Sequence, residues 1–165
     1  MKSVNWWPMR VGEIDIAYSM PVGRAEDEHI IWERYKLFIP GCHVLKEEQK
    51  ILGYVISHPW VLNSPPPFNK LLDILPTEPD CYHIHDIAIL PEHRGNNYAM
   101  SMVNWLLLNA ADIGFSRASV VTTQDMESYW QRYGFQRVDN IDLSSYNDTY
   151  AIYMVNAFDI GSNTR

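Results

Sequence analysis

One stretch of this 165-residue chain, residues 82–114, limits its possible folds more than any other. Residues 82–90 are predicted to form a strand, which Pro91 ends because proline lacks the N–H that a strand ladder needs. Residues 96–113 carry apolar side chains at helical spacing, and Gly114 is the residue type expected just past a helix end. A strand that leads through a short turn into a long helix predicts a sheet with helices packed on it.

The rest of the chain predicts short elements of both kinds. Helices are expected at residues 12–20, 27–38 and 126–133. Further strands are expected at residues 4–7, 42–45, 51–57, 117–122, 135–138 and 150–158. The order predicts a mixed α/β (α+β) fold with a mixed sheet of about six to seven strands.

A proline-rich segment at residues 59–80 interrupts this pattern, because six of the ten prolines of the chain lie in it. Since proline has a fixed φ and no N–H, the segment cannot be a central strand and is predicted to be a loop insertion, of the kind that forms a lid or a pocket wall. Residues 69–75 within it are compatible with a short helix. One domain is expected at residues 1–160, followed by a flexible tail at residues 161–165.

Charge and composition exclude several classes of protein. The net charge of −7 disfavours nucleic acid as a partner, because an acidic surface repels phosphates. No apolar run approaches the roughly 18 residues of a membrane span, and the N-terminal residues lack the apolar run of a signal peptide. We therefore expect a cytoplasmic protein without a membrane partner, in which Cys42 and Cys81 are reduced and buried.

The turn between the strand and the long helix is a candidate anion site. Helix N-termini present unpaired N–H groups and a partial positive charge. Gly95 allows the backbone to approach a ligand closely, and Arg94 adds a positive charge beside it. By themselves these residues leave open an ordinary strand–turn–helix with a surface arginine.

Two motifs in this part of the chain resemble those of the GCN5-related N-acetyltransferases (GNAT family). Arg94-Gly-Asn-Asn-Tyr-Ala99 is similar to the family pattern Arg/Gln-x-x-Gly-x-Gly/Ala, with Asn97 where the family most often has glycine. Asparagine tolerates the left-handed conformation better than most residues, so the loop can still form. Tyr129-Trp-Gln-Arg-Tyr-Gly-Phe135 is similar to the pattern Phe-Tyr-x-x-x-Gly-Phe, and the order of elements fits from about residue 4 to 158.

The resemblance implies a GNAT-like fold with helices on both faces of the sheet and acetyl-CoA as the donor. Its pyrophosphate would be held by the backbone of Arg94, Gly95, Asn96, Asn97, Tyr98 and Ala99. The pantetheine arm would pair with the backbone of Ile87, Ala88 and Ile89, in a gap where the strand at residues 82–90 splays from the strand at residues 117–122. An N–H there would stabilise the oxyanion of the tetrahedral intermediate.

Acylation of an amine needs a base near neutral pH, because most alkyl amines are protonated there. His83 and His85 lie two apart on a strand and are expected on one face, with Asp86 on the other. Paired histidines occupy this strand in the arylalkylamine N-acetyltransferase branch, which His-x-His resembles here. His85 is the first candidate base and His83 a relay or substrate contact, while Asp86 acting through a water is an alternative base. His-x-His is also a metal-ligand pattern, although no third ligand is evident and no metal is expected.

Trp130 stands where the family usually has the tyrosine that protonates the departing thiolate. Indole N–H can hydrogen-bond the sulfur of CoA but cannot serve as such an acid. Tyr129 and Tyr133 are adjacent alternatives, although both are expected to be packing residues.

The predicted activity is direct transfer of the acetyl group of acetyl-CoA to a primary amine of a small molecule or a protein. The first two helices and the proline-rich segment would build the acceptor side, with four aromatic residues as candidate pocket walls: Trp32, Tyr35, Trp60 and Phe68. The alternatives are a non-catalytic acyl-CoA sensor and a metal-dependent enzyme that uses the two histidines. A homodimer is possible.

Overall fold

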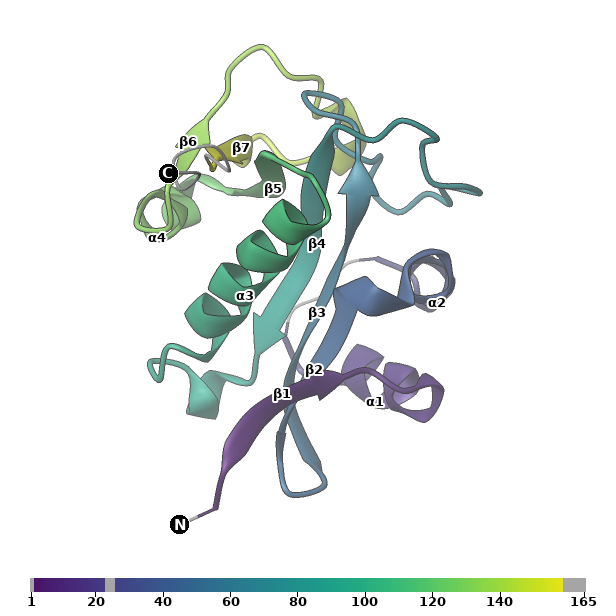
Figure 1. The fold of residues 1–165 in the computed structure, drawn as a ribbon, viewed down its shortest axis with the longest axis vertical. Helices are drawn as coiled ribbons and strands as arrows, with labels where there is room; N and C mark the ends of the chain where they lie inside the picture. Colours follow the sequence, from purple (N-terminus) through teal and green to yellow (C-terminus); the bar gives the residue numbers. More distant parts are fainter. Residues whose placement is uncertain (1, 23–25, 159–165) are drawn as a thin grey trace.

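A computed structural model describes residues 2–22 and 26–158, and the predicted tail at residues 161–165 lies outside the described residues. Its centre is a seven-stranded sheet in the order β1-β2-β3-β4-β5-β7-β6, which confirms the predicted mixed fold (Figure 1). The strands are β1 (Val4–Pro8), β2 (Cys42–Glu47), β3 (Lys50–Trp60), β4 (Cys81–Ile89), β5 (Arg117–Thr123), β6 (Phe135–Arg137) and β7 (Ala151–Ala157).

The sheet is splayed at its centre. Every neighbouring pair of strands is antiparallel except β4 and β5, which are parallel. The ladder between β4 and β5 runs from Tyr82 and Ala118 only to Ile84 and Val120, although both strands continue further. The predicted gap between these strands is therefore present.

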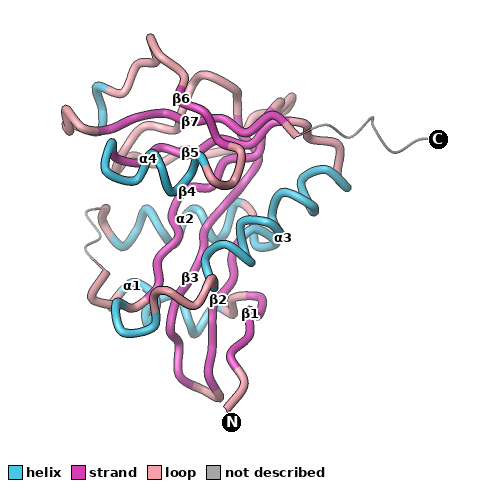
Figure 2. Tube along the Cα trace, turned by 90° about the vertical axis from the view of Figure 1, so that its left-hand side faces the viewer, coloured by secondary structure: helices cyan, strands magenta, loops and turns pink. Residues whose placement is uncertain are grey.

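Helices cover both faces of the sheet, as Figure 2 shows from the side. On one face lie α1 (Ile14–Tyr18) and α2 (Glu28–Leu37), which pack on β2 and β3. On the other lie α3 (Tyr98–Asp112) and α4 (Glu127–Gln131), whose apolar residues share a core with β4, β5 and β7. The buried residues of α3 lie on one apolar stripe, which agrees with its predicted amphipathic pattern: Met102, Val103, Leu106 and Ala110.

The proline-rich segment begins later than predicted, because β3 continues through Pro59 to Trp60. Pro59 pairs with Tyr82 of β4, whereas the ladder with β2 on the other side ends at Ile56. Beyond Ile56, β3 is thus an edge strand on that side, where the missing N–H of a proline leaves no ladder hydrogen bond unmade.

The short helix predicted at residues 69–75 is absent. Asn69 and Asp73 both have positive φ, at 55° and 65°, which a right-handed helix does not allow. The N–H groups of Leu72 and Asp73 donate instead to the carboxylate of Glu33 in α2, at 2.6 and 3.0 Å. Hydrogen bonds to Glu33 of α2 have therefore replaced the hydrogen bonds that a local helix would make.

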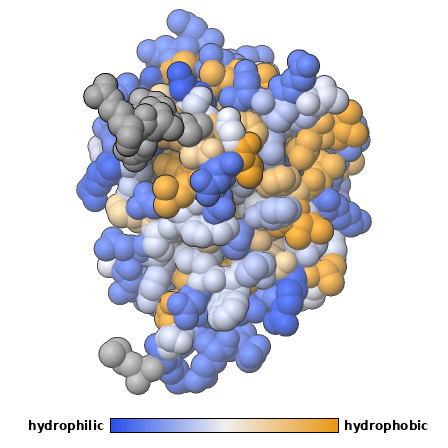
Figure 3. All heavy atoms as spheres, in the orientation of Figure 1, coloured by the Kyte–Doolittle hydropathy of each residue, from blue (hydrophilic) through white to orange (hydrophobic). Residues whose placement is uncertain are grey.

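In the space-filling view, apolar residues gather at the upper right, where the segment at residues 61–80 lies (Figure 3). Three of its apolar side chains are exposed, Val61, Leu71 and Ile74. Cys42 and Cys81 are free thiols in the interior, as predicted. None of the described helices is both long enough and apolar enough to cross a membrane.

Candidate active site

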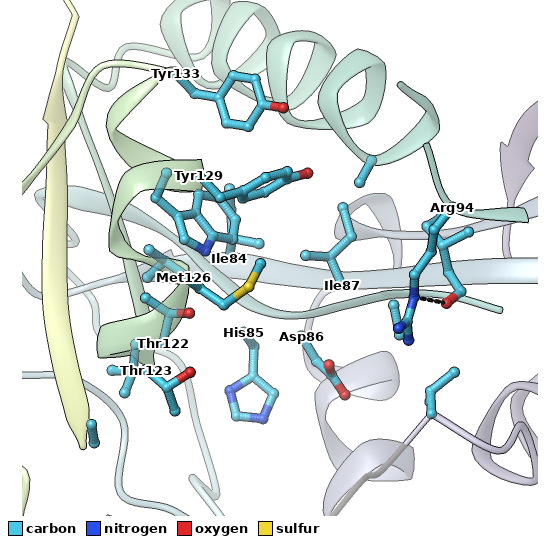
Figure 4. Close-up of a pocket in the computed structure, with 18 of the residues that line it drawn as sticks. Ile84, His85, Asp86, Ile87, Arg94, Thr122, Thr123, Met126, Tyr129 and Tyr133 are labelled. Carbon is cyan, nitrogen blue, oxygen red and sulfur yellow. Dashed lines mark hydrogen bonds between the residues drawn. The ribbon is translucent and has the colours of Figure 1, made fainter. Parts of the chain in front are cut away.

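A pocket of about 1280 Å³ occupies the gap between β4 and β5. Its walls come from the second half of β4, the end of β5, the first turn of α3, and α4. Val22 and Glu26, which precede α2, and the connection between β6 and β7 line it as well. Figure 4 shows this pocket, with Arg94 at one side and the two threonines Thr122 and Thr123 of β5 at the other.

The turn before α3 has the geometry of an anion site. Gly95 and Asn97 both have positive φ, at 84° and 60°, and alternating backbone of this kind points successive N–H groups into a common concavity. Asn97 is the N-cap of α3 in the left-handed conformation, and its side chain makes no capping bond. The first N–H groups of a 15-residue helix are therefore not capped by that side chain and meet the pocket together with the positive end of the helix dipole.

Arg94 lies beside this turn. Its Nε donates to the carbonyl oxygen of Ile89 at 3.0 Å, which fixes the side chain against the end of β4. Ile87, Ala88, Ile89 and most of the predicted loop residues line the same pocket. Asn96 is the exception, because its side chain turns back to the carbonyl oxygen of His93.

Asp86 does not lie on the opposite face from His85, as strand alternation had predicted. Ser57 of β3 pairs with Ile84 and Ile56 pairs with Asp86, so His85 is an extra residue in β4 that has no ladder partner. Such a bulge breaks the alternation of side chains. As a result both His85 and Asp86 project into the pocket from β4 (Figure 4).

Asp86 is already engaged by the protein, since its Oδ2 accepts a hydrogen bond from the hydroxyl of Tyr54 at 2.8 Å. Tyr54 belongs to β3 and also lines the pocket. The bond holds the carboxylate against the sheet, a role that the sequence pattern did not indicate.

His85 is paired with Glu26, a residue that the sequence analysis did not select. The distance from His85 Nε2 to Glu26 Oε1 is 2.6 Å, and both side chains are almost fully buried. Burial is the largest influence and raises the pKa of Glu26, but the hydrogen bond and charge of His85, the N–H of Asn69 and the charge of Arg34 together hold that pKa below its ordinary value. Glu26 is therefore an ionised acceptor, and the Nε2–H of His85 is the donor.

Two further groups stabilise the charge of Glu26. The N–H of Asn69 donates to Glu26 Oε2 at 2.9 Å. The buried guanidinium of Arg34 contributes to the low pKa of Glu26 and lies 3.3 Å from the Oε1 of Glu33. These partners keep the Glu26 carboxylate ionised in the interior. Burying an unpaired ion would cost on the order of several kcal/mol.

His83 lies deeper than His85 and does not line the pocket. Its Nδ1 lies 2.9 Å from the hydroxyl of Ser119, and the ring of His58 stands about as close to His83 as to His85, at 5.7 and 6.2 Å between centroids. Burial lowers the pKa of His58 to about 3 and that of His83 well below its ordinary value, so both are neutral at pH 7. This position offers no direct contact with a substrate, and a relay role for His83 remains a prediction.

Within the described ranges, no three His, Cys, Asp or Glu groups are arranged to hold a metal ion. Burial raises the pKa of the Cys42 thiol to about 12 and that of Cys81 to about 11, and neither residue lines the pocket. Neither thiol is therefore placed to act as a nucleophile.

Three aromatic residues of the α4 region form one wall. Trp130 is 4% exposed and packs edge-on against Phe135, so most of its indole belongs to the core. Tyr129 and Tyr133 pack edge-on at 5.0 Å, and both line the pocket (Figure 4). Burial and the neighbouring Tyr133 raise the pKa of Tyr129 far above its ordinary value, so its hydroxyl keeps its proton at neutral pH.

Of the four aromatic residues predicted to line an acceptor pocket, only Phe68 does so. Tyr35 is a core residue whose hydroxyl donates to the carbonyl oxygen of Met9, and Trp32 donates to Asp15 of α1. Trp60 donates to the carbonyl oxygen of Ser64 within the proline-rich segment. A tyrosine from the far end of the chain, Tyr146, takes their place beside Phe68.

Comparison with known families agrees with this geometry. The model of the acetyltransferase (GNAT) family matches residues 9–135, most of the chain. The fold and site thus define an acyl-group transferase, and the chain belongs to the GNAT acetyltransferase family. No curated protein matches the sequence.

Solved structures with the same fold are remote in sequence. The loading GNATL domain of CurA from Lyngbya majuscula is 16% identical with a TM-score of 0.76, over 96% of this chain and 98% of that one. Naa50 from Arabidopsis thaliana, in complex with the bisubstrate analogue CoA-Ac-MVNAL, is 12% identical with a TM-score of 0.69, over 94% and 99%. N-acetylglutamate synthase from Neisseria gonorrhoeae, complexed with coenzyme A and N-acetyl-glutamate, is 14% identical with a TM-score of 0.67, over 96% of this chain but only 36% of that one. At these identities the likeness concerns the fold.

Proposed function

We propose that this protein transfers the acetyl group of acetyl-CoA directly to a primary amine. The observation that carries the proposal is the arrangement of one pocket. An uncapped helix start with Arg94 lies at one end, and the buried pair of His85 and Glu26 lies at the other. One pocket thus offers both a site for an anionic cofactor and a base for an amine, so the thioester and the amine can meet in it.

The donor would bind along β4. The pyrophosphate is placed at the N–H groups between Gly95 and Ala99, where the helix dipole and Arg94 favour negative charge. The pantetheine arm is placed along Ile87 to Ile89, because the ladder with β5 has ended at Ile84 and leaves this edge facing the pocket. The bound CoA structures among the neighbours support this choice of donor.

His85 is the proposed general base. Its Nε2–H is directed to the ionised Glu26, so Nδ1 carries the lone pair that accepts a proton. The Glu26 carboxylate orients the ring and lies next to the positive charge that the ring acquires. The amine nitrogen then forms a bond to the acetyl carbon, and the carbon–sulfur bond breaks as the tetrahedral intermediate collapses.

Tyr129 is the proposed acid for the departing thiolate. Trp130 occupies the position from which the family usually supplies that proton, and it is packed into the core. Tyr129 lines the pocket, and a tyrosine hydroxyl carries its proton at neutral pH, so it has one to donate. The proton passes from Tyr129 to sulfur, and the proton that His85 took from the amine returns through solvent to the Tyr129 oxygen. An amine N–H is thereby exchanged for a thiol S–H, and both side chains regain their starting state.

The test is free-thiol release from acetyl-CoA in the presence of a panel of primary amines. Amine-dependent release, with the acetylated amine identified by mass spectrometry, is the expected result. Tight CoA binding without turnover on any amine would instead support the acyl-CoA sensor. Tyr129→Phe, compared with Tyr18→Phe outside the pocket, tests the acid and is expected to lower kcat without changing CoA affinity.

A further inference from the structure

The proline-rich segment at residues 61–80, hereafter the wall segment, lacks helix and strand and is nevertheless fixed on two sides. On one side it is tied to α2 and the residues before it, where Asn69 and Asp27 exchange hydrogen bonds and Glu33 accepts two backbone N–H groups. In Figure 1 the segment lies at the same end of the sheet as the connection between β6 and β7.

The second attachment is to that β6–β7 connection. The N–H of Phe68 donates to the hydroxyl of Ser145 at 3.0 Å. The hydroxyl of Tyr146 donates to the carbonyl oxygen of Pro66 at 2.9 Å, and the rings of Phe68 and Tyr146 are 5.4 Å apart. The wall segment therefore bridges two connections that are far apart in the sequence.

The bridge lies at the acceptor end of the pocket. Glu26, Phe68 and Tyr146 all line the pocket, and Glu26 binds both His85 and the N–H of Asn69. The wall segment holds Glu26 through the N–H of Asn69, and Glu26 in turn orients the proposed base His85. The same segment also contacts the β6–β7 connection. From the geometry we propose, on the basis of the proposed function, that the acceptor is a small free amine and that the wall segment excludes polypeptides.

The reason is steric. A lysine or an N-terminus brings a chain that must leave the pocket, and the space between Glu26 and the β6–β7 connection is occupied by Pro66 to Asn69. The wall also offers no strand edge for a peptide to pair with, because Pro65, Pro66 and Pro67 have no N–H. A compact amine needs neither an exit path nor a ladder.

Charge at this end favours a cationic amine. Among the described lining residues, Glu26, Asp86 and Asp148 are acidic and lie on β4, before α2 or in the β6–β7 connection. The lining arginines, Arg94 and Arg132, belong to the α3 and α4 side instead. A protonated amine is attracted to the acidic end, where His85 removes its proton.

The experiment compares butylamine, phenylethylamine and spermidine with two peptides, one with a free N-terminus and one blocked peptide with a single lysine. Thiol release by the full chain should favour the best small amine over either peptide by about 100-fold or more in kcat/KM, as a steric block of the competitor predicts. Peptide turnover equal to that of the small amines would overturn the inference but leave the proposed function intact. No release with any acceptor would overturn the proposed function itself.

Two variants outside the pocket lining loosen the wall, Glu33→Gln and Ser145→Ala. Each should raise the ratio of peptide to small-amine kcat/KM by roughly tenfold, the change expected when a charged or backbone hydrogen bond that holds the segment is lost. Glu28→Gln, on the exposed side of α2, is the matched control. A folded Glu33→Gln variant with the wild-type ratio would contradict the role of the wall, and circular dichroism confirms the fold.

Discussion

The two ends of the pocket are built in different ways. The donor end is one continuous piece of chain, in which β4, the turn at Arg94 to Asn97 and α3 follow each other directly. The acceptor end joins the residues before α2, the wall segment, β4 and the β6–β7 connection. Glu26 and His85 alone are 59 residues apart in sequence.

This difference decides how each end responds to mutation. At the donor end the proposed binding groups belong to the backbone, so a side-chain change is expected to act through charge or through backbone conformation. At the acceptor end the proposed functional groups are side chains, and partners from other segments hold them. Four predictions separate the two ends.

The largest effect is expected for His85→Ala, which removes the proposed base. Turnover should fall by about 100-fold or more, as loss of a general base predicts, and the fall should be deepest below neutral pH, where free amine is scarcest. The KM for acetyl-CoA should stay unchanged, because His85 lies outside Ile87–Ile89 and the turn at Arg94, which are the segments proposed to bind CoA. A steady-state pH profile checks this, with the exposed His29→Ala as control. A profile with the shape and height of the wild type would remove His85 from the mechanism.

The next effect is expected at the donor end. Arg94→Glu puts a negative charge at the pyrophosphate site and should weaken acetyl-CoA binding by roughly 100-fold, the loss expected when a charge-assisted contact becomes repulsive. Isothermal titration with CoA measures it. Lys50→Glu makes the same charge change at the exposed first residue of β3, outside the pocket, and should leave the affinity unchanged. Equal affinities for wild type and Arg94→Glu would refute the assignment of this turn.

A smaller effect tests the backbone of the same turn. Asn97 has a φ of 60°, so Asn97→Ala should lower the free energy of unfolding by about 1 kcal/mol, because alanine tolerates the left-handed region less well. Asn97→Gly should not, since glycine has no Cβ to strain. Urea denaturation of both variants measures the difference. If alanine proves as stable as glycine here, the left-handed turn is not the constraint that the dihedral angles indicate.

The fourth prediction concerns the pH dependence of stability at the acceptor end. The pKa of Glu26 is lowered in the folded state, so its contribution is present above the ordinary carboxyl range and is lost as pH falls through the folded pKa. Glu26→Gln should cost about 1–2 kcal/mol of unfolding free energy at pH 7, the size of a charged hydrogen bond, and less at pH 4. Urea denaturation at several pH values measures this, with the exposed Glu28→Gln as reference. A difference between variant and wild type that stays constant with pH would contradict it.

Much of the donor end was readable from the sequence. The strand at residues 82–90, the stop at Pro91 and the helical stripe before Gly114 depend on local periodicity and on the conformational limits of proline and glycine. Asn97 has the left-handed conformation that asparagine tolerates better than most residues, which is the property that allows a loop similar to the family motif. These features depend only on neighbouring residues, so they can be predicted from the sequence.

The acceptor end was not readable in the same way. Strand alternation placed Asp86 away from His85, but a bulge brought both into the pocket, and no residue type in the sequence marks that bulge. Three of the four aromatic candidates do not line the pocket, because their side chains pack in the core or bond to other segments. Glu26 and Tyr146 gave no signal, since an isolated acid or tyrosine in a connection is common on any surface.

The sequence by itself determined the order of elements, the helix start that lines the pocket and the family to which the chain belongs. Only the tertiary structure decided which histidine reaches the pocket, which carboxylate holds it and what closes the acceptor end. The physical reason is range. Backbone conformation follows from residues within a few positions, whereas a buried ion pair forms only when the folded sheet brings distant segments together and removes their water.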